Sequence, residues 1–168
     1  LILLKFISNY YNNMPNWSNS YYRFVSDDTK AGNTQIKTLL ENCKKFQENS
    51  ESDVFRIDDK KTFAYHVLPF PDEWDKDWCC TNWGTKWAES DFRIVNENDT
   101  DIEPDGFEIT YQTPWCNFSK EWNRTLTDKY PNVKIFVMTD YECDQFSRDY
   151  KCFYDGSFVD ESEEEVSV

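Results

Sequence analysis

The chain has 168 residues, 18% of them aromatic, so it is long enough for one hydrophobic core and too aromatic to be disordered throughout. Its 32 acidic residues against 18 Lys and Arg give a formal net charge of −14. A surface this acidic is repelled by phosphate backbones and anionic membranes, so we expect neither direct nucleic-acid binding nor membrane binding. With only 39% hydrophobic residues, the core is expected to consist mainly of Phe, Tyr and Trp.

Residues 1–13 are set apart from the domain that follows. The apolar run over residues 1–7 is too short to cross a membrane and has no basic leader, and a Met follows at position 14. We expect residues 1–13 to be an N-terminal extension and residues 14–158 to form a single cytoplasmic domain. The acidic run over residues 159–168 is predicted to be a disordered tail.

The first half of the domain is predicted to begin with a strand and a helix. Aromatic and β-branched residues predict a strand over residues 18–25, and apolar residues three and four apart predict a helix over residues 33–46, followed by a polar loop. Two short strands are predicted over residues 54–57 and 62–68.

A segment rich in Pro and Trp comes next, over residues 69–80, and we predict an irregular stretch with a helical turn near Trp74 and Trp78. Residues of about 54–82 together are taken as an insertion into the domain.

The second half is predicted to hold strands over residues 91–95 and 107–112, a helix over residues 117–130, a strand over residues 133–138 and a last hairpin that includes residues 150–154. Without the insertion, the order is strand, helix, strand, strand, helix, strand, which is the split βαβ arrangement. The sequence therefore predicts an α+β, ferredoxin-like fold, with an antiparallel sheet, two helices on one face and the other face in solvent.

The segment Asn82–Trp87 (Asn-Trp-Gly-Thr-Lys-Trp) places two tryptophans four positions apart around a glycine. Glycine allows a turn with positive φ, so the two indoles can close over each other or over a neighbouring strand. The segment contains no nucleophile, general base or phosphate loop, and we predict a structural role. The residues given this structural role are Trp17, Asn82, Trp83, Gly84, Thr85, Lys86, Trp87 and Trp115.

Three segments together resemble a known family: Met14-Pro15-Asn16-Trp17, Asn82–Trp87, and Thr113-Pro114-Trp115 followed by Lys129-Tyr130-Pro131-Asn132-Val133. They are similar to the YubB-like, Api-type ferredoxin-like domain family of phages and plasmids, over residues 14 to about 142. The resemblance implies a ferredoxin-like sheet and an origin on a mobile element. It implies no particular activity.

Catalytic and metal sites have little support in the sequence. His66 is the single histidine and lies in an alternating run, so a hydrogen-bonded strand residue is favoured over a general base. The six cysteines are irregularly spaced and include no pair two to four positions apart, so we expect mostly buried, reduced thiols rather than a zinc site. We predict no enzymatic activity, no metal and no cofactor.

The acidic surface is the stronger functional feature, because carboxylates spaced along strands and loops can imitate a row of phosphates. We predict a phage or plasmid protein that inhibits a host protein with a basic surface, such as an immune nuclease, in the manner of an anti-CRISPR or anti-restriction protein. The predicted partner-binding carboxylates are Asp72, Glu73, Asp75, Asp77, Asp99, Asp101, Glu103, Asp105, Asp140, Glu142 and Asp144.

A different function remains open, namely a pocket for a small molecule or nucleotide near Trp83, Trp87 and His66. In that case an aromatic wall would hold the ligand, and the histidine and a carboxylate would converge on it. The oligomeric state is not fixed by the sequence.

Overall fold

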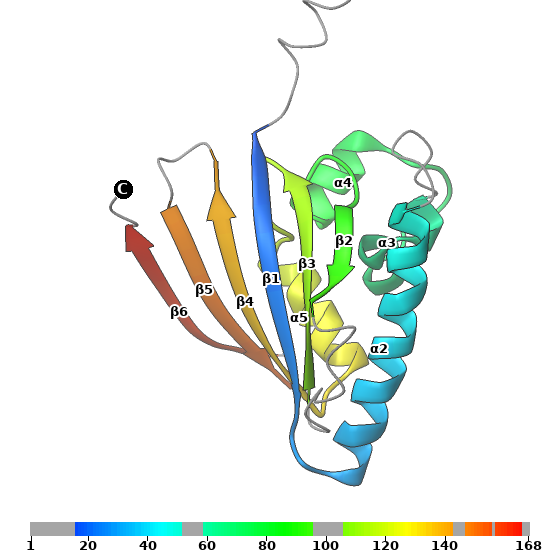
Figure 1. The fold of residues 1–168 in the computed structure, drawn as a ribbon. Coiled ribbons are helices and arrows are strands. Elements are labelled where there is room, and N and C mark those ends of the chain that lie inside the picture. Colours follow the sequence, from blue (N-terminus) through cyan, green and yellow to red (C-terminus); the bar gives the residue numbers. More distant parts are fainter. Residues whose placement is uncertain (1–15, 52–58, 96–105, 143–146, 156, 166–168) are drawn as a thin grey trace, which may run out of the picture.

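The computed structural model describes residues 16–51, 59–95, 106–142, 147–155 and 157–165. These residues form one six-stranded antiparallel sheet in the order β2-β3-β1-β4-β5-β6, with the helices gathered on one of its faces (Figure 1). The strands are β1 (Trp17–Ser26), β2 (Ser90–Ile94), β3 (Gly106–Pro114), β4 (Val133–Tyr141), β5 (Ser147–Tyr154) and β6 (Ser157–Glu165). The helices are α2 (Lys30–Glu51), the 3-10 turn η1 (Asp59–Lys61), α3 (Phe63–Val67), α4 (Lys76–Asn82) and α5 (Lys120–Lys129).

The connections confirm the ferredoxin-like α+β fold. Helix α2 joins β1 to β2, helix α5 joins β3 to β4, and each pair of parallel strands has one antiparallel strand between them. The predicted strands at 18–25, 91–95, 107–112, 133–138 and 150–154 correspond to β1, β2, β3, β4 and β5, and the predicted helices at 33–46 and 117–130 to α2 and α5. The hairpin of β5 and β6 widens the sheet beyond the four strands of the split βαβ core.

The core between the sheet and the helices is aromatic, as the composition predicts. Along β1, Tyr22 and Phe24 point into the core while Tyr21 and Arg23 point away, because successive side chains of a strand alternate between its faces. Phe63 of α3 is fully buried, and the centroid of its ring lies 5.1–6.4 Å from the centroids of six other aromatic rings. Such offset and edge-on contacts add to the stabilisation that burial alone provides.

The strand predicted over residues 62–68 is wrong, because Phe63–Val67 form helix α3. The Thr62 side chain caps the helix by accepting from the Tyr65 N–H, and the Glu89 carboxylate accepts from the N–H groups of Phe63 and Ala64. The acceptor that favours the helix thus lies 25 residues or more away in the sequence. The other predicted short strand, residues 54–57, lies outside the described residues.

Helix α2 extends beyond the predicted helix into residues 47–51, whose polar character favoured a loop. Two of these polar side chains bond the outer edge of the sheet: Gln47 Oε1 accepts from the Ile94 N–H at 2.7 Å and Ser50 Oγ from the Phe92 N–H at 3.1 Å. Strand β2 is an edge strand, so α2 satisfies backbone donors that have no neighbouring strand on that side.

The disordered tail predicted from residue 159 is corrected for residues 159–165, which belong to strand β6 and pair with β5. The backbone groups of β5 supply a hydrogen-bonding ladder, and the acidic run completes it as the last strand of the sheet. The helical turn predicted near Trp74 and Trp78 is α4, which includes Trp78 and begins two residues after Trp74.

Candidate interaction site

The two tryptophans of the signature segment occupy different environments. Trp83 is fully buried, its Nε1 donates to the Leu68 carbonyl at 2.7 Å, and its ring packs against Phe70 and Trp78. Trp87 is half-buried and packs edge-on against Trp17, with ring centroids 6.5 Å apart. The segment therefore contributes one indole to the core and one to the surface.

The glycine between them adopts the positive φ expected of the turn, +81°. A Cβ on Gly84 would lie 3.0 Å from the backbone nitrogen of Ser119, which is the N-cap of α5. Ser119 is bonded to the turn through its N–H to the Trp83 carbonyl at 2.7 Å and its hydroxyl to the Asn82 carbonyl at 3.0 Å. The turn is thereby fixed against the beginning of α5.

Three tryptophans from distant parts of the chain gather at the end of the sheet where β1 begins and β3 ends, two of them on one lysine (Figure 1). The Lys86 Nζ lies 5.0 Å from the ring centre of Trp87 and 5.1 Å from that of Trp115, and Trp17 packs on Trp87. Trp115 has a φ of +71° and is 48% exposed. Trp17, Lys86, Trp87 and Trp115 are called the tryptophan cluster below.

Two of the predicted carboxylates lie beside the tryptophan cluster. The backbone of Glu142 donates to the Trp17 carbonyl at 3.1 Å, and the Glu142 carboxylate accepts from the Trp17 N–H at 2.9 Å. Asp140 lies opposite Asn19, two residues further along β1. Glu142 is exposed and Asp140 half-buried, so the indoles and two acids share one end of the sheet.

The remaining predicted carboxylates lie elsewhere or outside the described residues. Asp72, Glu73, Asp75 and Asp77 are all exposed in one segment that leads into α4, and Asp75 caps that helix by accepting from the Trp78 N–H at 2.6 Å. The positions outside the described residues are Asp99, Asp101, Glu103, Asp105 and Asp144.

His66 lies on helix α3, where its ring packs against Phe46 and its Nε2 lies 3.0 Å from the Tyr130 hydroxyl. Burial, with the nearby Lys129 and Lys45 ammonium groups adding to it, lowers the pKa of His66 to about 4, so the ring is neutral at pH 7. The three residues of the alternative pocket thus have different neighbours. Trp83 packs in the core, Trp87 packs on Trp17, and the His66 ring lies against Phe46 and Tyr130.

The thiols are less uniformly buried than predicted. Cys43 and Cys79 are buried, whereas Cys80 is exposed and Cys116 and Cys152 are half-buried. Burial, with the Glu89 carboxylate adding to it, raises the pKa of the Cys43 thiol well above its usual value. In the part of the chain that the structure describes, no three His, Cys, Asp or Glu side chains are grouped to hold a metal ion. No helix among the described residues is long and apolar enough to cross a bilayer.

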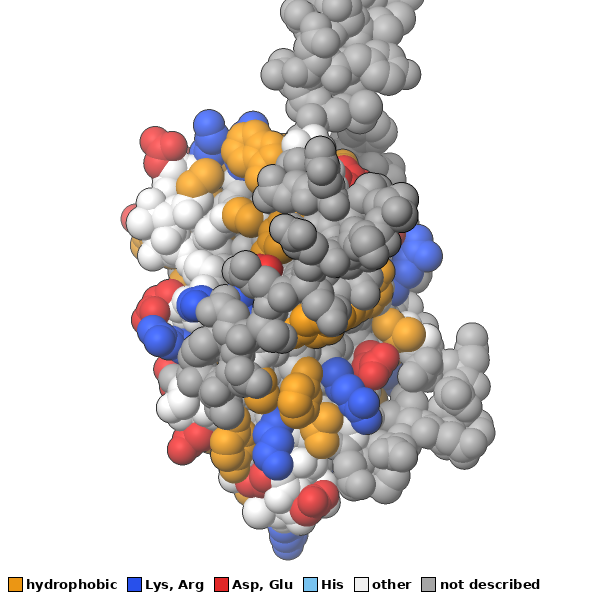
Figure 2. Space-filling model, turned by 90° about the vertical axis from the view of Figure 1, so that its left-hand side faces the viewer, with side chains coloured by type: hydrophobic (Ala, Val, Ile, Leu, Met, Phe, Trp, Pro, Cys, Tyr) orange, Lys and Arg blue, Asp and Glu red, His pale blue; other side chains and the backbone are white. Residues whose placement is uncertain are grey.

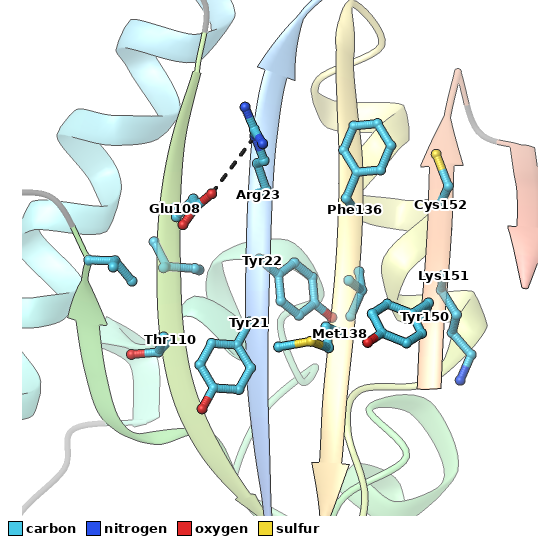
Figure 3. A pocket seen from close by; sticks show the side chains of 13 residues that line it. Tyr21, Tyr22, Arg23, Glu108, Thr110, Phe136, Met138, Tyr150, Lys151 and Cys152 are labelled. Carbon is cyan, nitrogen blue, oxygen red and sulfur yellow. Dashed lines mark ion pairs between the residues drawn. The ribbon is translucent and has the colours of Figure 1, made fainter. Parts of the chain in front are cut away.

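The sequence reasoning missed a groove of about 430 Å³ on the face of the sheet opposite the helices. In the space-filling view, hydrophobic side chains gather on this face among scattered charges, and the close-up shows side chains from neighbouring strands lining the hollow (Figures 2 and 3). The side chains of the groove that point away from the helices include Tyr21, Arg23, Glu108, Thr110, Phe136, Met138, Tyr150 and Cys152. Aromatic and apolar residues at the outward positions of the predicted strands were the available signal.

The fold and the described surface define a ferredoxin-like α+β protein with an aromatic, partly acidic sheet end. No family model matches the chain, and no curated protein matches it. The crystal structure of Api92 from Yersinia pseudotuberculosis, a DUF1281 protein, is similar in fold, with a TM-score of 0.53 and 8% sequence identity. The alignment covers 92% of this chain and 100% of that one. At this identity the likeness concerns the fold alone.

Proposed function

We propose that the protein is a non-enzymatic binding protein that docks on a basic surface of another protein through the tryptophan cluster and the adjoining Asp140 and Glu142. The observation that carries the proposal is the meeting of three partly exposed indoles beside two carboxylates at one end of the sheet. Tryptophan is among the residues that contribute most to binding when a partner covers it, because its large ring loses little conformational entropy.

The backbone of Trp115 supports this proposal. A bulky residue at positive φ is strained, and such strain is retained chiefly where a side chain has to be held in a particular place. Lys86 fills the space between Trp87 and Trp115 and holds both rings by cation–π attraction. Arginines of the partner can then bond the Glu142 carboxylate through their planar guanidinium groups or stack on the exposed ring of Trp115.

The charge of the chain supports a basic partner. Asp72, Glu73, Asp75 and Asp77 form a second exposed acidic segment, and the formal net charge of −14 creates a field that speeds encounter with a positive surface. Such attraction weakens as salt screens it, since the Debye length falls from about 10 Å at 0.1 M to about 3 Å at 1 M.

Within this class, the partner we propose is a host nucleic-acid-binding immune nuclease, and the protein is its inhibitor, encoded by a phage or plasmid. A nuclease groove is basic because it binds phosphates, and carboxylates can take their place. The resemblance of the tryptophan-containing segments to the YubB-like, Api-type domains supports a mobile-element origin. The neutral, hydrogen-bonded His66 agrees with a role in binding rather than in acid–base chemistry.

The test is inhibition of purified restriction nucleases and guide-RNA-directed nucleases by the full chain at rising NaCl concentration. We expect one of them to be inhibited, with inhibition weakening roughly tenfold or more between low and high salt. Trp115→Ala and Glu142→Gln are expected to weaken it, whereas Glu121→Gln, which removes an exposed carboxylate from α5, is the matched control. Inhibition that is insensitive to salt and to both site variants, or no inhibition at low salt, contradicts the proposal.

A further inference from the structure

The open face of the sheet carries two rows of side chains that cross the strands side by side (Figure 3). The strand registers place Thr110, Tyr21, Met138 and Tyr150 opposite one another in the first row. The same registers place Glu108, Arg23, Phe136 and Cys152 in the second row, two residues away along each strand. Together the two rows line the groove of about 430 Å³.

The groove combines exposed apolar side chains with an ion pair. Tyr21 is 40% and Phe136 43% exposed, and they lie on the neighbouring strands β1 and β4. A contiguous exposed apolar patch commonly marks an interaction site. In the groove, Arg23 is paired with Glu108, with 3.8 Å between Nε and Oε1. A face with this local balance, on a chain of net charge −14, is suited to a partner that is not itself strongly basic.

The outward side chains of β4 show what such a partner needs to offer. In chain order they are Lys134, Phe136, Met138 and Asp140: a cation, two apolar groups and an anion. Lys134 is exposed, with its Nζ 5.8 Å from the ring centre of Tyr154, and Asp140 is half-buried at the other end of the strand. Read in reverse, the same four side chains complement themselves in charge and polarity: the cation faces the anion, and the apolar groups face each other.

We propose that a second copy of this chain covers the groove, packed face to face about a two-fold axis parallel to the two rows. Rotation about this axis places each strand over the same strand of the other copy and reverses its direction. Each first-row residue therefore faces the second-row residue of that strand in the other copy. Met138 then meets Phe136 of the second copy, Tyr21 meets Arg23, and Lys134 meets Asp140 at both ends of β4.

The three contacts named above are attractive and occur twice, as in any isologous interface. Two sheets pack at a spacing of about 10 Å, which their side chains span. A thioether beside an aromatic ring and a guanidinium over a tyrosine ring are both attractive arrangements. Burying the groove also removes the exposed Tyr21 and Phe136 rings from water. The inference requires no other protein, but it shares Asp140 with the docking surface of the proposed function.

The mass of the purified chain in solution tests the dimer, measured by sedimentation over a roughly hundredfold range of protein concentration. The expected mass at the upper end is twice the 20.2 kDa of one chain. Lys134→Asp places two acids opposite each other, and Asp140→Lys two bases, so each variant is expected to shift the mass toward the monomer. The double variant K134D/D140K restores the opposite charges and is expected to restore the dimer.

Lys120→Asp, a charge reversal at an exposed position of α5, is the matched control and is expected to leave the dimer unchanged. Phe136→Ser removes an exposed apolar contact without adding charge, and its mass is also expected to fall toward the monomer. A wild-type chain that stays monomeric throughout the concentration range overturns the inference. A dimer that neither Lys134→Asp nor Phe136→Ser weakens, or that the double variant does not restore, overturns it as well.

Discussion

The Glu89 side chain shows how a single buried residue decides a local structure. It is 3% exposed, and its carboxylate accepts hydrogen bonds from the Phe63 and Ala64 N–H groups at the start of α3. A helix leaves its first N–H groups without partners in the helix itself, and an anion at that end also interacts favourably with the helix dipole. The carboxylate thus holds Phe63 in helical conformation at the centre of the core.

Replacing this residue is expected to destabilise the protein. Glu89→Ala leaves two buried N–H groups without their acceptor and is expected to lower the free energy of unfolding by about 2–4 kcal/mol. Glu89→Gln retains one carbonyl acceptor and is expected to cost less. Urea denaturation followed by tryptophan fluorescence measures both, and equal stability of wild type and Glu89→Ala contradicts the capping role.

His66 gives the protein a specific pH dependence. Its pKa is about 4 in the folded chain against 6.5 for an unperturbed histidine, so the unfolded chain binds more protons between these values. The contribution of His66 to the free energy of unfolding is therefore fully present above pH 6.5 and is lost as the pH falls toward 4. For a half-buried ring screened by solvent we expect this loss to be about 1–2 kcal/mol.

The measurement compares wild type with His66→Gln in urea at several pH values. The carboxylates that titrate at low pH are the same in both chains, so the difference between the two curves isolates His66. The stability of wild type is expected to fall more steeply with decreasing pH than that of the variant. Parallel curves from pH 7 to pH 4 mean that the ring is protonated without penalty in the folded state.

Local sequence identified the tryptophans of the site but not their environments. Trp83 and Trp87 belong to one short segment, yet the first is enclosed by Phe70 and Trp78 and the second meets Trp17. The difference depends on which distant residues the fold brings to each ring. Composition alone therefore could not show that Trp87 and Trp115 both contact Lys86, or that Trp17 packs on Trp87.

At the scale of elements, periodicity succeeded where an element is long and has one apolar face. Strands β1, β3 and β4 alternate between buried and outward side chains, and α5 buries Trp122 and Leu126 on one side. The five-residue helix α3 is too short for periodicity to separate it from a strand. Its capping by Glu89 and the pairing of β6 with β5 are contacts that a local pattern cannot reveal.

The turn between α4 and β2 couples two elements, and Gly84 is the position at which this coupling can be broken. Gly84→Ala would place a Cβ 3.0 Å from the Ser119 backbone in a conformation with φ of +81°. Strain in the turn and displacement of the α5 N-cap are expected to lower the free energy of unfolding by about 1–3 kcal/mol.

The control for this variant is Thr81→Ala, at an exposed position of the neighbouring helix α4. Alanine suits an ordinary helical conformation, so this change is expected to alter the stability little. Thermal unfolding compares the two, and Gly84→Ala is expected to melt at the lower temperature. The reverse order contradicts the role assigned to positive φ.

For the whole molecule, the topology followed from the order of the elements. A right-handed crossover through each helix leaves few ways to arrange strand, helix, strand, strand, helix, strand, and the ferredoxin-like sheet is one of them. The groove on the open face did not follow from the order of the elements. Outward residues such as Tyr21 and Phe136 do not belong to the periodic pattern of buried residues that predicts strands and helices. Their alignment in rows depends on the registers of β1, β4 and β5.

The net charge of −14 has a consequence for the stability of the whole fold. Folding brings the excess carboxylates closer together, and salt screens their mutual repulsion. Raising NaCl from a low concentration to about 0.5 M is therefore expected to increase the free energy of unfolding by about 1–2 kcal/mol, measured by urea denaturation at one fixed protein concentration.

A variant with Asp72→Asn, Glu73→Gln and Asp77→Asn removes three exposed carboxylates and changes the formal charge from −14 to −11, while the cap residue Asp75 stays in place. Because less repulsion remains to be screened, its stability is expected to rise less with salt than that of wild type. If both proteins respond equally, the repulsion arises from other carboxylates of the chain. If salt lowers the free energy of unfolding of the wild type, attractive ion pairs outweigh the repulsion between carboxylates. The excess of acidic residues then does not destabilise the fold.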